Sequence, residues 1–274
     1  MFVAKESSPL FLHAPGFSLK DTIDCGQCFR WETDGTCYRG VVKNLSLTIR
    51  QEGETLFLYG SKESDLSFWR SYFDLDGAYP FLKKLYQKDP VLKAASEFAG
   101  GITILRQDPW EALCSFILSQ NNNIPRIKGI IKRLCESLGD PIGKNLYSFP
   151  PPERIAASGL ENLEYLRAGF RSKYILDAAE KIVAGQLNLN DIMFLPYEEA
   201  KSALMQITGV GPKVADCALL YGFHRLEAFP IDVWIKRVME RYYPNGLPPF
   251  ALESAGVAQQ YLFHSIRAGV LEGL

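Results

Sequence analysis

The sequence predicts an α+β fold, with an antiparallel sheet domain over residues 1–100 and a mostly helical domain over residues 101–274. Two observations lead to this prediction. Residues 17–59 contain short apolar or alternating runs separated by turn residues, whereas the apolar positions from Leu66 onward recur at helical spacing. Gly100-Gly101 marks the expected boundary. With 274 residues, 47% of them hydrophobic, the chain is long enough to bury a core in one large or two modest domains.

Turn residues divide the first segment into four expected strands. The turns fall at Thr33-Asp34-Gly35, Lys43-Asn44 and Gln51-Glu52-Gly53-Glu54, where Gly, Asn and Asp favour reversals of the chain. The strands between these turns are residues 28–31, 38–42, 45–49 and 56–59. Such short runs in close succession predict an antiparallel meander.

Helical periodicity predicts the remaining elements. Apolar residues recur at helical spacing between positions 66 and 98, and Asp108-Pro109 is typical of a helix start, where aspartate caps and proline fits the first turn. The helices expected after the boundary are residues 109–118, 124–138, 153–157, 160–166, 174–184, 197–207, 233–242 and 251–270, and another that begins at Pro212.

Composition excludes membrane-spanning and secreted proteins. No window approaches about eighteen uninterrupted apolar residues, and the first residues lack the features of a signal peptide. We therefore expect an intracellular protein, in the cytoplasm or nucleoid of a prokaryote or in the nucleus of a eukaryote. The net charge of −1 is a poor signature of a nucleic-acid binder. However, Arg126, Lys128, Lys132 and Arg133 cluster against Glu136, and a local basic face suffices for a short DNA footprint.

The six cysteines are expected to be buried thiols, because disulfides are rare in intracellular proteins. Cys25 and Cys28 have the spacing of a metal-binding pair, but the other candidate ligands nearby are only Cys37 and His13. We therefore expect no metal and no organic cofactor.

Residues 206–242 carry the most informative pattern. Ile207 closes one helical pattern, Gly209 and Gly211 supply the positive-φ freedom of a tight turn, and Pro212 suits the first position of a new helix. A helix, a hairpin and a helix are therefore expected at about residues 201–220. The backbone N–H groups at such a turn, together with the positive end of the second helix, bind a phosphate without a basic side chain.

Lys213 and Asp232 lie at two helix starts in this pattern. An amine that is partly desolvated near the positive end of a helix loses part of its preference for the charged form, which a nucleophilic lysine requires. Asp232 follows a loop and precedes the helix at 233–242, as an N-cap does. Each residue also has a simpler interpretation. Lys213 could form a solvated ion pair with Asp216, three residues later, and Asp232 could be only a cap.

The combination of Gly-Val-Gly, Lys213 and Asp232 resembles the helix-hairpin-helix, Gly/Pro-Asp class of base-excision DNA glycosylases. A nucleotide-binding P-loop does not fit, because the glycine spacing differs and no Ser or Thr follows the lysine. Within the class, nearly the full chain resembles 8-oxoguanine DNA glycosylases. The resemblance rests on the motifs CGQCFRW at 25–31, YFDLD at 72–76, RQDP at 106–109, SQNNNIPRI at 119–127, GVGPKVADC at 209–217 and AQQYLF at 258–263. The chain has no cysteine after Cys217, which rules out the C-terminal four-cysteine iron–sulfur loop of other branches.

The resemblance implies a sheet domain of the TATA-binding-protein-like kind, a duplex DNA substrate and roles for the matching residues. Lys213 would attack the sugar C1′ and form a Schiff base, and Asp232 would stabilise the positive charge that develops on the sugar. The backbone carbonyl of Gly26 would read the hydrogen on N7 that distinguishes 8-oxoguanine from guanine. Two further matches place Cys217 and Phe263 on either side of the extruded base and Gln259 at its Watson–Crick edge.

Four other matches concern the DNA. Asn121 and Phe170 match the residues that fill the hole left by the flipped nucleotide and wedge the stack. Arg126 and Arg171 match the arginines that hydrogen-bond the orphaned cytosine, which predicts a preference for lesions opposite C. From the residues alone, a capping and turn cluster is the preferred interpretation of the asparagines. The arginines could form phosphate contacts or surface ion pairs.

The chain departs from the family pattern at two positions. Thr208 stands where the hairpin often has proline, and Trp234 stands where some relatives have a phosphate-contacting histidine. Two alternatives to an 8-oxoguanine glycosylase/lyase are a monofunctional alkylated-base glycosylase that uses Asp232 alone and a non-catalytic DNA-binding module. We expect a monomer whose partner is double-stranded DNA containing 8-oxoguanine.

Overall fold

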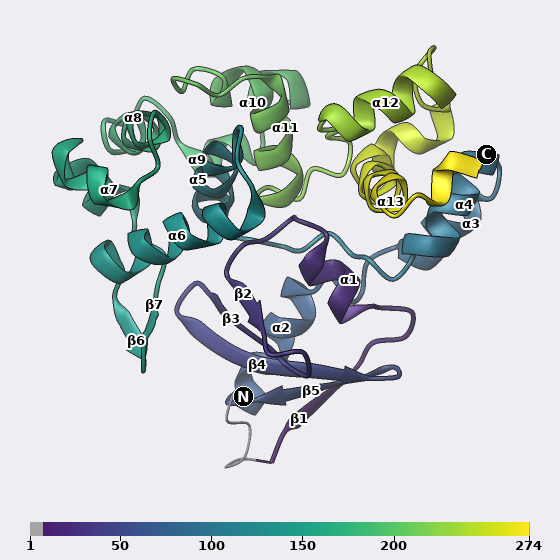
Figure 1. The fold of residues 1–274 in the computed structure, drawn as a ribbon, viewed down its shortest axis with the longest axis horizontal. Coiled ribbons are helices and arrows are strands. Elements are labelled where there is room, and N and C mark those ends of the chain that lie inside the picture. The colour runs from purple at the N-terminus through teal and green to yellow at the C-terminus, as the bar shows by residue number, and fades with distance from the viewer. Residues whose placement is uncertain (1–7, 274) are drawn as a thin grey trace.

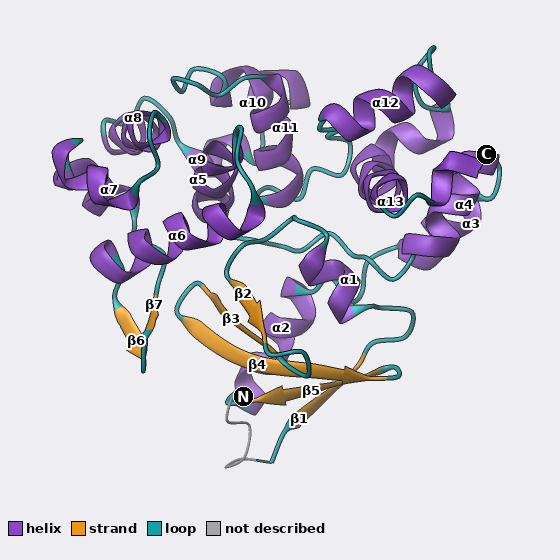
Figure 2. Cartoon of the chain, viewed as in Figure 1, coloured by secondary structure: helices purple, strands orange, loops and turns teal. Residues whose placement is uncertain are grey.

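The computed structural model describes residues 8–273 of the chain. An antiparallel sheet forms one end of the molecule, and the helices lie on one side of it in two groups (Figures 1 and 2). Helices α5 to α11 form one group, and α12, α13, α3 and α4 form the other. The predicted α+β fold, a sheet domain packed on a mostly helical domain, is confirmed.

The sheet has five strands in the order β1-β5-β4-β3-β2, and all neighbouring strands are antiparallel. The strands are β1 (Leu10–His13), β2 (Trp31–Thr33), β3 (Tyr38–Val42), β4 (Leu45–Glu52) and β5 (Thr55–Tyr59). The meander β2 to β5 was predicted, although β2 begins only at Trp31. Strand β1 and the helix α1 (Leu19–Asp24) were not predicted, because β1 has only four residues and α1 only six.

The two faces of the sheet differ in chemistry. Trp31, Leu47, Ile49, Leu56 and Leu58 are buried on the inner face, which packs against Trp69 and Phe73 of the segment that begins with α2. A side chain at the position of Gly40 would collide with the Trp31 ring, 2.3 Å from a built Cβ. The residues between these positions point to the other face, since side chains alternate along a strand.

The helices follow the predicted pattern closely. Those around the sheet and in the second group are α2 (Leu66–Tyr72), α3 (Tyr79–Tyr86), α4 (Pro90–Ala99), α12 (Val233–Tyr242) and α13 (Ala255–Arg267). Those in the first group are α5 (Pro109–Ser119), α6 (Ile124–Leu138), α7 (Pro152–Ser158), α8 (Arg171–Val183), α9 (Leu189–Ile192), α10 (Tyr197–Leu204) and α11 (Pro212–Tyr221). The structure also has a small hairpin, β6 (Pro141–Gly143) and β7 (Leu146–Tyr147), that was not predicted.

The single C-terminal helix predicted over residues 251–270 is wrong. A 3₁₀ helix (Pro249–Ser254) precedes α13, and another (Val270–Gly273) follows it. The second break follows the end of α13, where Gly269 has φ +76°, a conformation that glycine adopts without strain.

The packing between the helices runs across the boundary predicted at residues 100–101. Helices α3 and α4 share a hydrophobic core with α13, through Tyr86, Leu92 and Ala95 on one side and Tyr261 on the other. The Tyr86 hydroxyl donates a hydrogen bond to the Ser254 carbonyl oxygen (2.9 Å). The core of the helical part therefore includes helices from both sides of residue 100. The domain boundary at this residue stays a prediction.

Within residues 8–273, no helix is both long enough and apolar enough to cross a membrane. All six cysteines are buried and free, as predicted.

Candidate active site and DNA-binding face

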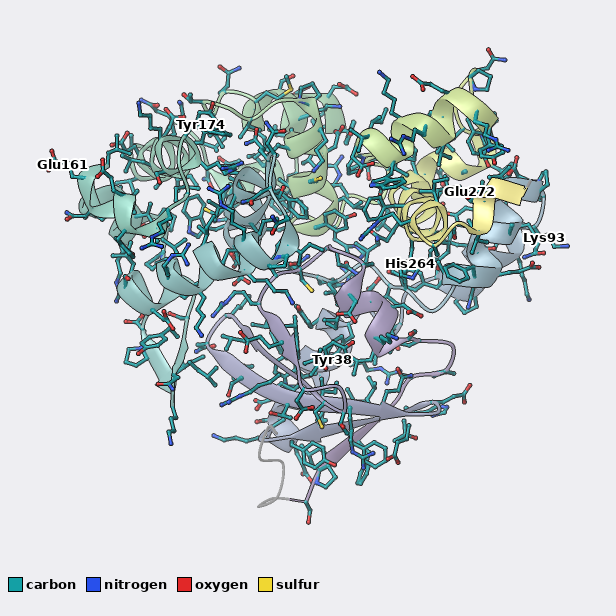
Figure 3. All side chains as sticks on the ribbon, viewed as in Figure 1. Tyr38, Lys93, Glu161, Tyr174, His264 and Glu272 are labelled. Atoms are coloured by element: carbon teal, nitrogen blue, oxygen red, sulfur yellow. The ribbon has the colours of Figure 1, made fainter. Side chains whose placement is uncertain are left out.

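Helices α10 and α11 are joined by a hairpin in which the two glycines differ. Gly209 has φ +79°, and a built Cβ would lie 2.3 Å from the Tyr174 ring of α8 (Figure 3 shows Tyr174). Gly211 has φ −96° and open space around the position of a Cβ, so the prediction that it needs a positive φ is wrong. Only Gly209 is required as glycine for the shape of the turn.

The hairpin is anchored on α8 and leaves the start of α11 uncapped. The backbone N–H of Thr208 donates to Asp177 Oδ2 (2.7 Å), and Lys181 donates to the same carboxylate (2.6 Å). Burial works against the charged form of Asp177, but these hydrogen bonds outweigh it and lower its pKa. Among the described residues 8–273, no side chain caps α11, so the N–H groups of its first turn are available for an anion.

Replacing Gly209 by alanine is expected to destabilise the protein by roughly 2–4 kcal/mol, because the new Cβ meets the Tyr174 ring and a non-glycine residue is strained at φ +79°. Gly211→Ala is the matched control, in the same loop but with φ −96° and open space. Its cost is expected to stay below about 1 kcal/mol. Urea unfolding of both variants measures the difference, and equal losses of stability would contradict this account of the turn.

Lys213 is the second residue of α11 and is half-buried, with its Nζ 5.7 Å from the centre of the Phe116 ring of α5. Asp216, its proposed ion-pair partner, turns instead to α10. There Tyr197 donates to Asp216 Oδ1 (2.5 Å) and Lys201 donates to Oδ2 (3.0 Å). Among residues 8–273, no carboxylate lies within ion-pair distance of Lys213. The simple ion-pair interpretation of Lys213 is therefore wrong.

Asp232 caps α12, as predicted. Its side chain accepts hydrogen bonds from the backbone N–H groups of Trp234 (3.0 Å) and Ile235 (2.8 Å) through one oxygen, Oδ1. The second carboxylate oxygen takes no part in this cap, and the residue is half-buried. A carboxylate held in this way keeps a fixed direction for its negative charge.

Cys217 lies within electrostatic reach of both residues. Burial raises the pKa of its thiol to about 11, the neighbouring Lys213 ammonium lowers it in part, and the negative charges of Asp216 and Asp232 raise it again. Lys213 and Asp232, nineteen positions apart in the sequence, therefore both contribute to the electrostatic environment of this buried thiol. At neutral pH this thiol stays protonated and presents an apolar surface.

A buried hydrogen-bond network joins α11 to α13 and to the loop that contains Gly26. The Tyr221 hydroxyl donates to Gln260 Oε1 (2.5 Å) and lies 3.4 Å from Gln259 Oε1. Gln260 in turn donates to the Cys25 carbonyl oxygen (3.4 Å). The network therefore ties α13 to the residue that precedes Gly26. Gly26 itself has φ +92°, which glycine tolerates.

Aromatic rings connect this network to Lys213. Phe116 stacks on Tyr221 with ring centres 5.0 Å apart, and its ring also faces Lys213 Nζ. Phe263 is half-buried on α13, with the Arg267 guanidinium 5.2 Å from its ring centre. Phe116, Tyr221 and Gln260 were not predicted as site residues. They stand at ordinary positions of apolar helix faces, and no sequence signal separates them from the core.

The four residues predicted to handle the DNA lie in the junction after α5, in the first turn of α6 and at the start of α8. Asn121 is exposed and adopts φ +46°, in the junction between α5 and α6. Phe170 is 47% exposed and packs edge-on against Tyr174, with ring centres 5.5 Å apart. Arg126 is exposed and donates to the Arg167 carbonyl oxygen (3.3 Å). Their roles in DNA binding stay predictions.

Arg171 differs from the other three because it is buried, with 3% of its surface exposed. It donates hydrogen bonds to the backbone carbonyl oxygens of Gln120 (2.7 Å), Asn121 (2.9 Å) and Ala168 (3.0 Å). Its guanidinium thus fixes the backbone on both sides of Asn121. Four of its five N–H donors are used in these hydrogen bonds, which leaves one on Nη1 for a further partner such as cytosine.

Among residues 8–273, no group of three or more His, Cys, Asp or Glu side chains is arranged to hold a metal ion. The prediction that the reaction needs no metal or cofactor is not tested by this arrangement.

Two family models match the chain. The model of the 8-oxoguanine DNA glycosylase N-terminal domain matches residues 10–113, and that of the HhH-GPD superfamily of base excision DNA repair proteins matches residues 114–247. Together with the hairpin and the lysine–aspartate pair, these matches define a helix-hairpin-helix DNA glycosylase.

Relatives narrow the class to a family. An N-glycosylase/DNA lyase of Saccharomyces cerevisiae is 35% identical over 258 residues, which cover 82% of this chain and 68% of the relative. The solved structure of MBOgg1 with a low-affinity DNA ligand is 42% identical, with a TM-score of 0.89 over 97% of each chain. An 8-oxoguanine glycosylase/lyase of Clostridium acetobutylicum, solved with double-stranded DNA containing cytosine opposite 8-oxoguanine, is 36% identical, with a TM-score of 0.86 over 96% of this chain and 97% of that one. The chain belongs to the 8-oxoguanine DNA glycosylase family.

Proposed function

We propose that this chain excises 8-oxoguanine from double-stranded DNA and then nicks the strand, with Lys213 as the nucleophile of both steps. The observation that carries the proposal is the environment of Lys213. It stands at the start of α11, where no side chain of residues 8–273 provides a cap, and its neighbour Asp216 is held by α10. The charges of Lys213 and of the fixed Asp232 carboxylate both act on the Cys217 thiol. The activity, glycosylase and lyase, is that of the family to which the chain belongs.

The proposed chemistry uses only the residues around Cys217. The uncharged Lys213 amine attacks C1′ of the flipped nucleotide, the bond from C1′ to the base breaks, and the base leaves after taking up a proton. Asp232 stabilises the positive charge that the sugar develops in this step. The lysine nitrogen then loses a proton, the C1′–O4′ bond opens and O4′ takes up a proton, which leaves an iminium, the Schiff base, between Lys213 and C1′. Loss of a C2′ proton from this iminium and cleavage of the C3′–O bond, with the 3′ phosphate as the leaving group, complete the β-elimination.

The proposed base pocket lies between Phe263, Cys217 and the Gly26 loop. The protonated thiol offers an uncharged surface to one face of the base, and the Phe263 ring offers the other. The amide of Gln259, which is only 4% exposed, would meet the Watson–Crick edge. Tyr221 would position this amide, because its hydroxyl contacts Gln259 Oε1. Gln260 would position the Gly26 loop, because it donates a hydrogen bond to the Cys25 carbonyl oxygen.

At the rim, we propose that Asn121 and Phe170 replace the flipped nucleotide in the stack while Arg126 and Arg171 face the cytosine. The exposed ring of Phe170 has the shape to wedge between bases. The hairpin around Gly209 and Gly211 would bind a phosphate of the lesion strand through N–H groups. A monomer suffices, since all these residues come from one chain.

A trapping experiment tests the proposal. Wild-type protein and duplex DNA with 8-oxoguanine opposite cytosine, reduced with borohydride, are expected to give a covalent adduct, whereas Lys213→Gln is expected to give none. Denaturing electrophoresis measures both the adduct and the nicked strand. Release of the base without an adduct would instead indicate attack by water, and binding without release or adduct would contradict an enzymatic function.

A further inference from the structure

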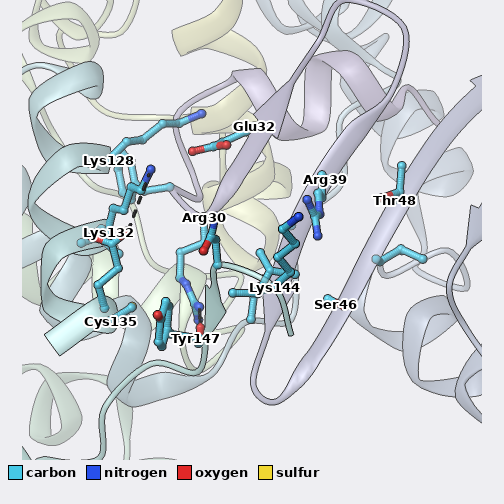
Figure 4. Close-up of a pocket in the computed structure, with 18 of the residues that line it drawn as sticks. Arg30, Glu32, Arg39, Ser46, Thr48, Lys128, Lys132, Cys135, Lys144 and Tyr147 are labelled. Carbon is cyan, nitrogen blue, oxygen red and sulfur yellow. Dashed lines mark hydrogen bonds and ion pairs between the residues drawn. The ribbon is translucent and has the colours of Figure 1, made fainter. Parts of the chain in front are cut away.

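A cavity lies outside the site described above. It has a volume of about 640 Å³ (Figure 4). It lies between α6, the β6–β7 hairpin and the face of the sheet that carries Arg39 and Tyr59. A volume of this size is within the range of small-molecule sites. None of the residues of the proposed active site lines it.

The sheet provides a polar and aromatic floor. The strand register aligns Glu32, Arg39, Thr48 and Tyr59 in one row across β2, β3, β4 and β5, because each is the cross-strand partner of the next. All four line the cavity. Tyr59 is half-buried and its hydroxyl accepts a hydrogen bond from Arg50 Nε (2.9 Å), so its ring is held in place.

The cavity has an excess of positive charge. Five of its lining residues are basic (Arg30, Arg39, Lys128, Lys132 and Lys144) and two are acidic (Glu32 and Glu136). Two of the basic residues are already occupied. Arg30 forms an ion pair with Glu111 (3.0 Å), and Lys128 donates to the Trp31 carbonyl oxygen (2.6 Å).

The other three cations are available to a ligand. Arg39 and Lys144 have no ion pair within the part of the chain that the structure describes, and Lys132 meets Glu136 only at 4.0 Å. In Figure 4 the Arg39 and Lys144 side chains, from β3 and from the β6–β7 hairpin, point toward one another. Like charges that converge repel each other, and an anion between them removes the repulsion.

We propose that this cavity binds a nucleotide unit, with its phosphate between Arg39, Lys132 and Lys144 and its base on the aromatic floor around Tyr59. Arginine and lysine together are the usual partners of a phosphate group, and a tyrosine ring is a stacking surface for a base. The hydroxyls of Ser46 and Thr48 lie on the same floor and can bond the sugar or base. The unit is either a free nucleotide or part of a single strand.

A purely acidic peptide explains less of the cavity. It would satisfy the cations, but it has no group that stacks on the aromatic ring of Tyr59. The active-site rim lies elsewhere on α6. Arg126 precedes Lys132 by six residues, which at 100° per residue places the two side chains on different sides of the helix. The cavity is therefore separate from the lesion site in position.

Binding of two probes tests the proposal. Wild-type protein, saturated with duplex DNA that carries an abasic analogue and so occupies the lesion site, is titrated with adenosine monophosphate or with a labelled thymidine oligomer of about ten nucleotides. At least one probe is expected to bind, and R39Q/K144Q is expected to weaken its binding by roughly tenfold or more and to flatten the salt dependence of the oligomer. Binding of the monophosphate identifies a free nucleotide as the ligand, and binding of the oligomer alone identifies a single strand.

The matched control is K84Q/K93Q, which removes two exposed cations on α3 and α4 (Figure 3 shows Lys93). Both double variants are expected to excise 8-oxoguanine from the duplex within about twofold of wild type, which shows that they fold. Equal probe affinities of the two double variants, no binding of either probe, or a glutamate peptide that binds as tightly as the oligomer would each overturn the proposal.

Discussion

Replacing Asp232 by asparagine is expected to slow excision of 8-oxoguanine by roughly 100- to 1,000-fold while the protein stays about as stable as wild type. The substitution separates the two roles of the residue. Asparagine is as good an N-cap as aspartate, and its Oδ1 can accept the same bonds from Trp234 and Ile235. It carries no charge, however, and cannot stabilise a developing positive charge on the sugar.

Single-turnover kinetics with excess protein measures the excision step alone, and urea unfolding measures stability. Asp232→Ala serves as the comparison, because it removes both the charge and the cap. It is expected to lose about as much activity as the asparagine variant and about 0.5–2 kcal/mol of stability in addition. An asparagine variant with wild-type rates would show that Asp232 is only a cap, the simpler interpretation of the sequence.

The parts of the site that the sequence could predict depend on local rules. The cap at Asp232, the turn at Gly209 and the start of α11 at Pro212 each follow from residues within one helix turn. The environment of Lys213 does not follow from such local residues. Its neighbour Asp216 is a possible partner by spacing, and only the position of α10 decides that Asp216 bonds Tyr197 and Lys201 instead.

Long-range contacts account for most of what could not be predicted. The bond between Gln260 and the Cys25 carbonyl oxygen joins residues 235 positions apart, and no periodicity encodes such a pair. Arg171 illustrates a second limit. A sequence match assigns it to the DNA, but the structure buries it among the carbonyl oxygens that hold the Asn121 junction. That Arg171 donates hydrogen bonds was predicted. Its backbone partners were not, because they depend on tertiary packing.

Asp74 joins three separate segments, and its replacement is expected to have a large effect on stability. Its carboxylate is only 5% exposed and accepts hydrogen bonds from the Tyr79 hydroxyl (2.7 Å), Arg106 Nε (2.7 Å) and His224 Nε2 (3.1 Å). Asp74→Asn keeps the shape and tolerates the φ of +49°. It leaves Arg106 and His224 beside a neutral group, and we expect a loss of roughly 3 kcal/mol at neutral pH.

The pH dependence of the unfolding free energy tests whether the charge of Asp74 causes this loss. Burial opposes the charged form of Asp74, but the hydrogen bonds from His224, Tyr79 and Arg106 outweigh burial and lower its pKa in the folded protein. A lowered pKa contributes stability that is fully present above the unfolded value of about 3.9 and is lost as the pH falls through the folded value. The difference in unfolding free energy between wild type and Asp74→Asn, measured in urea from pH 7 to pH 3, should therefore shrink below about pH 4. A difference that stays constant over this range would show that the charge of Asp74 does not stabilise the junction, and that the loss comes from changed hydrogen bonding alone.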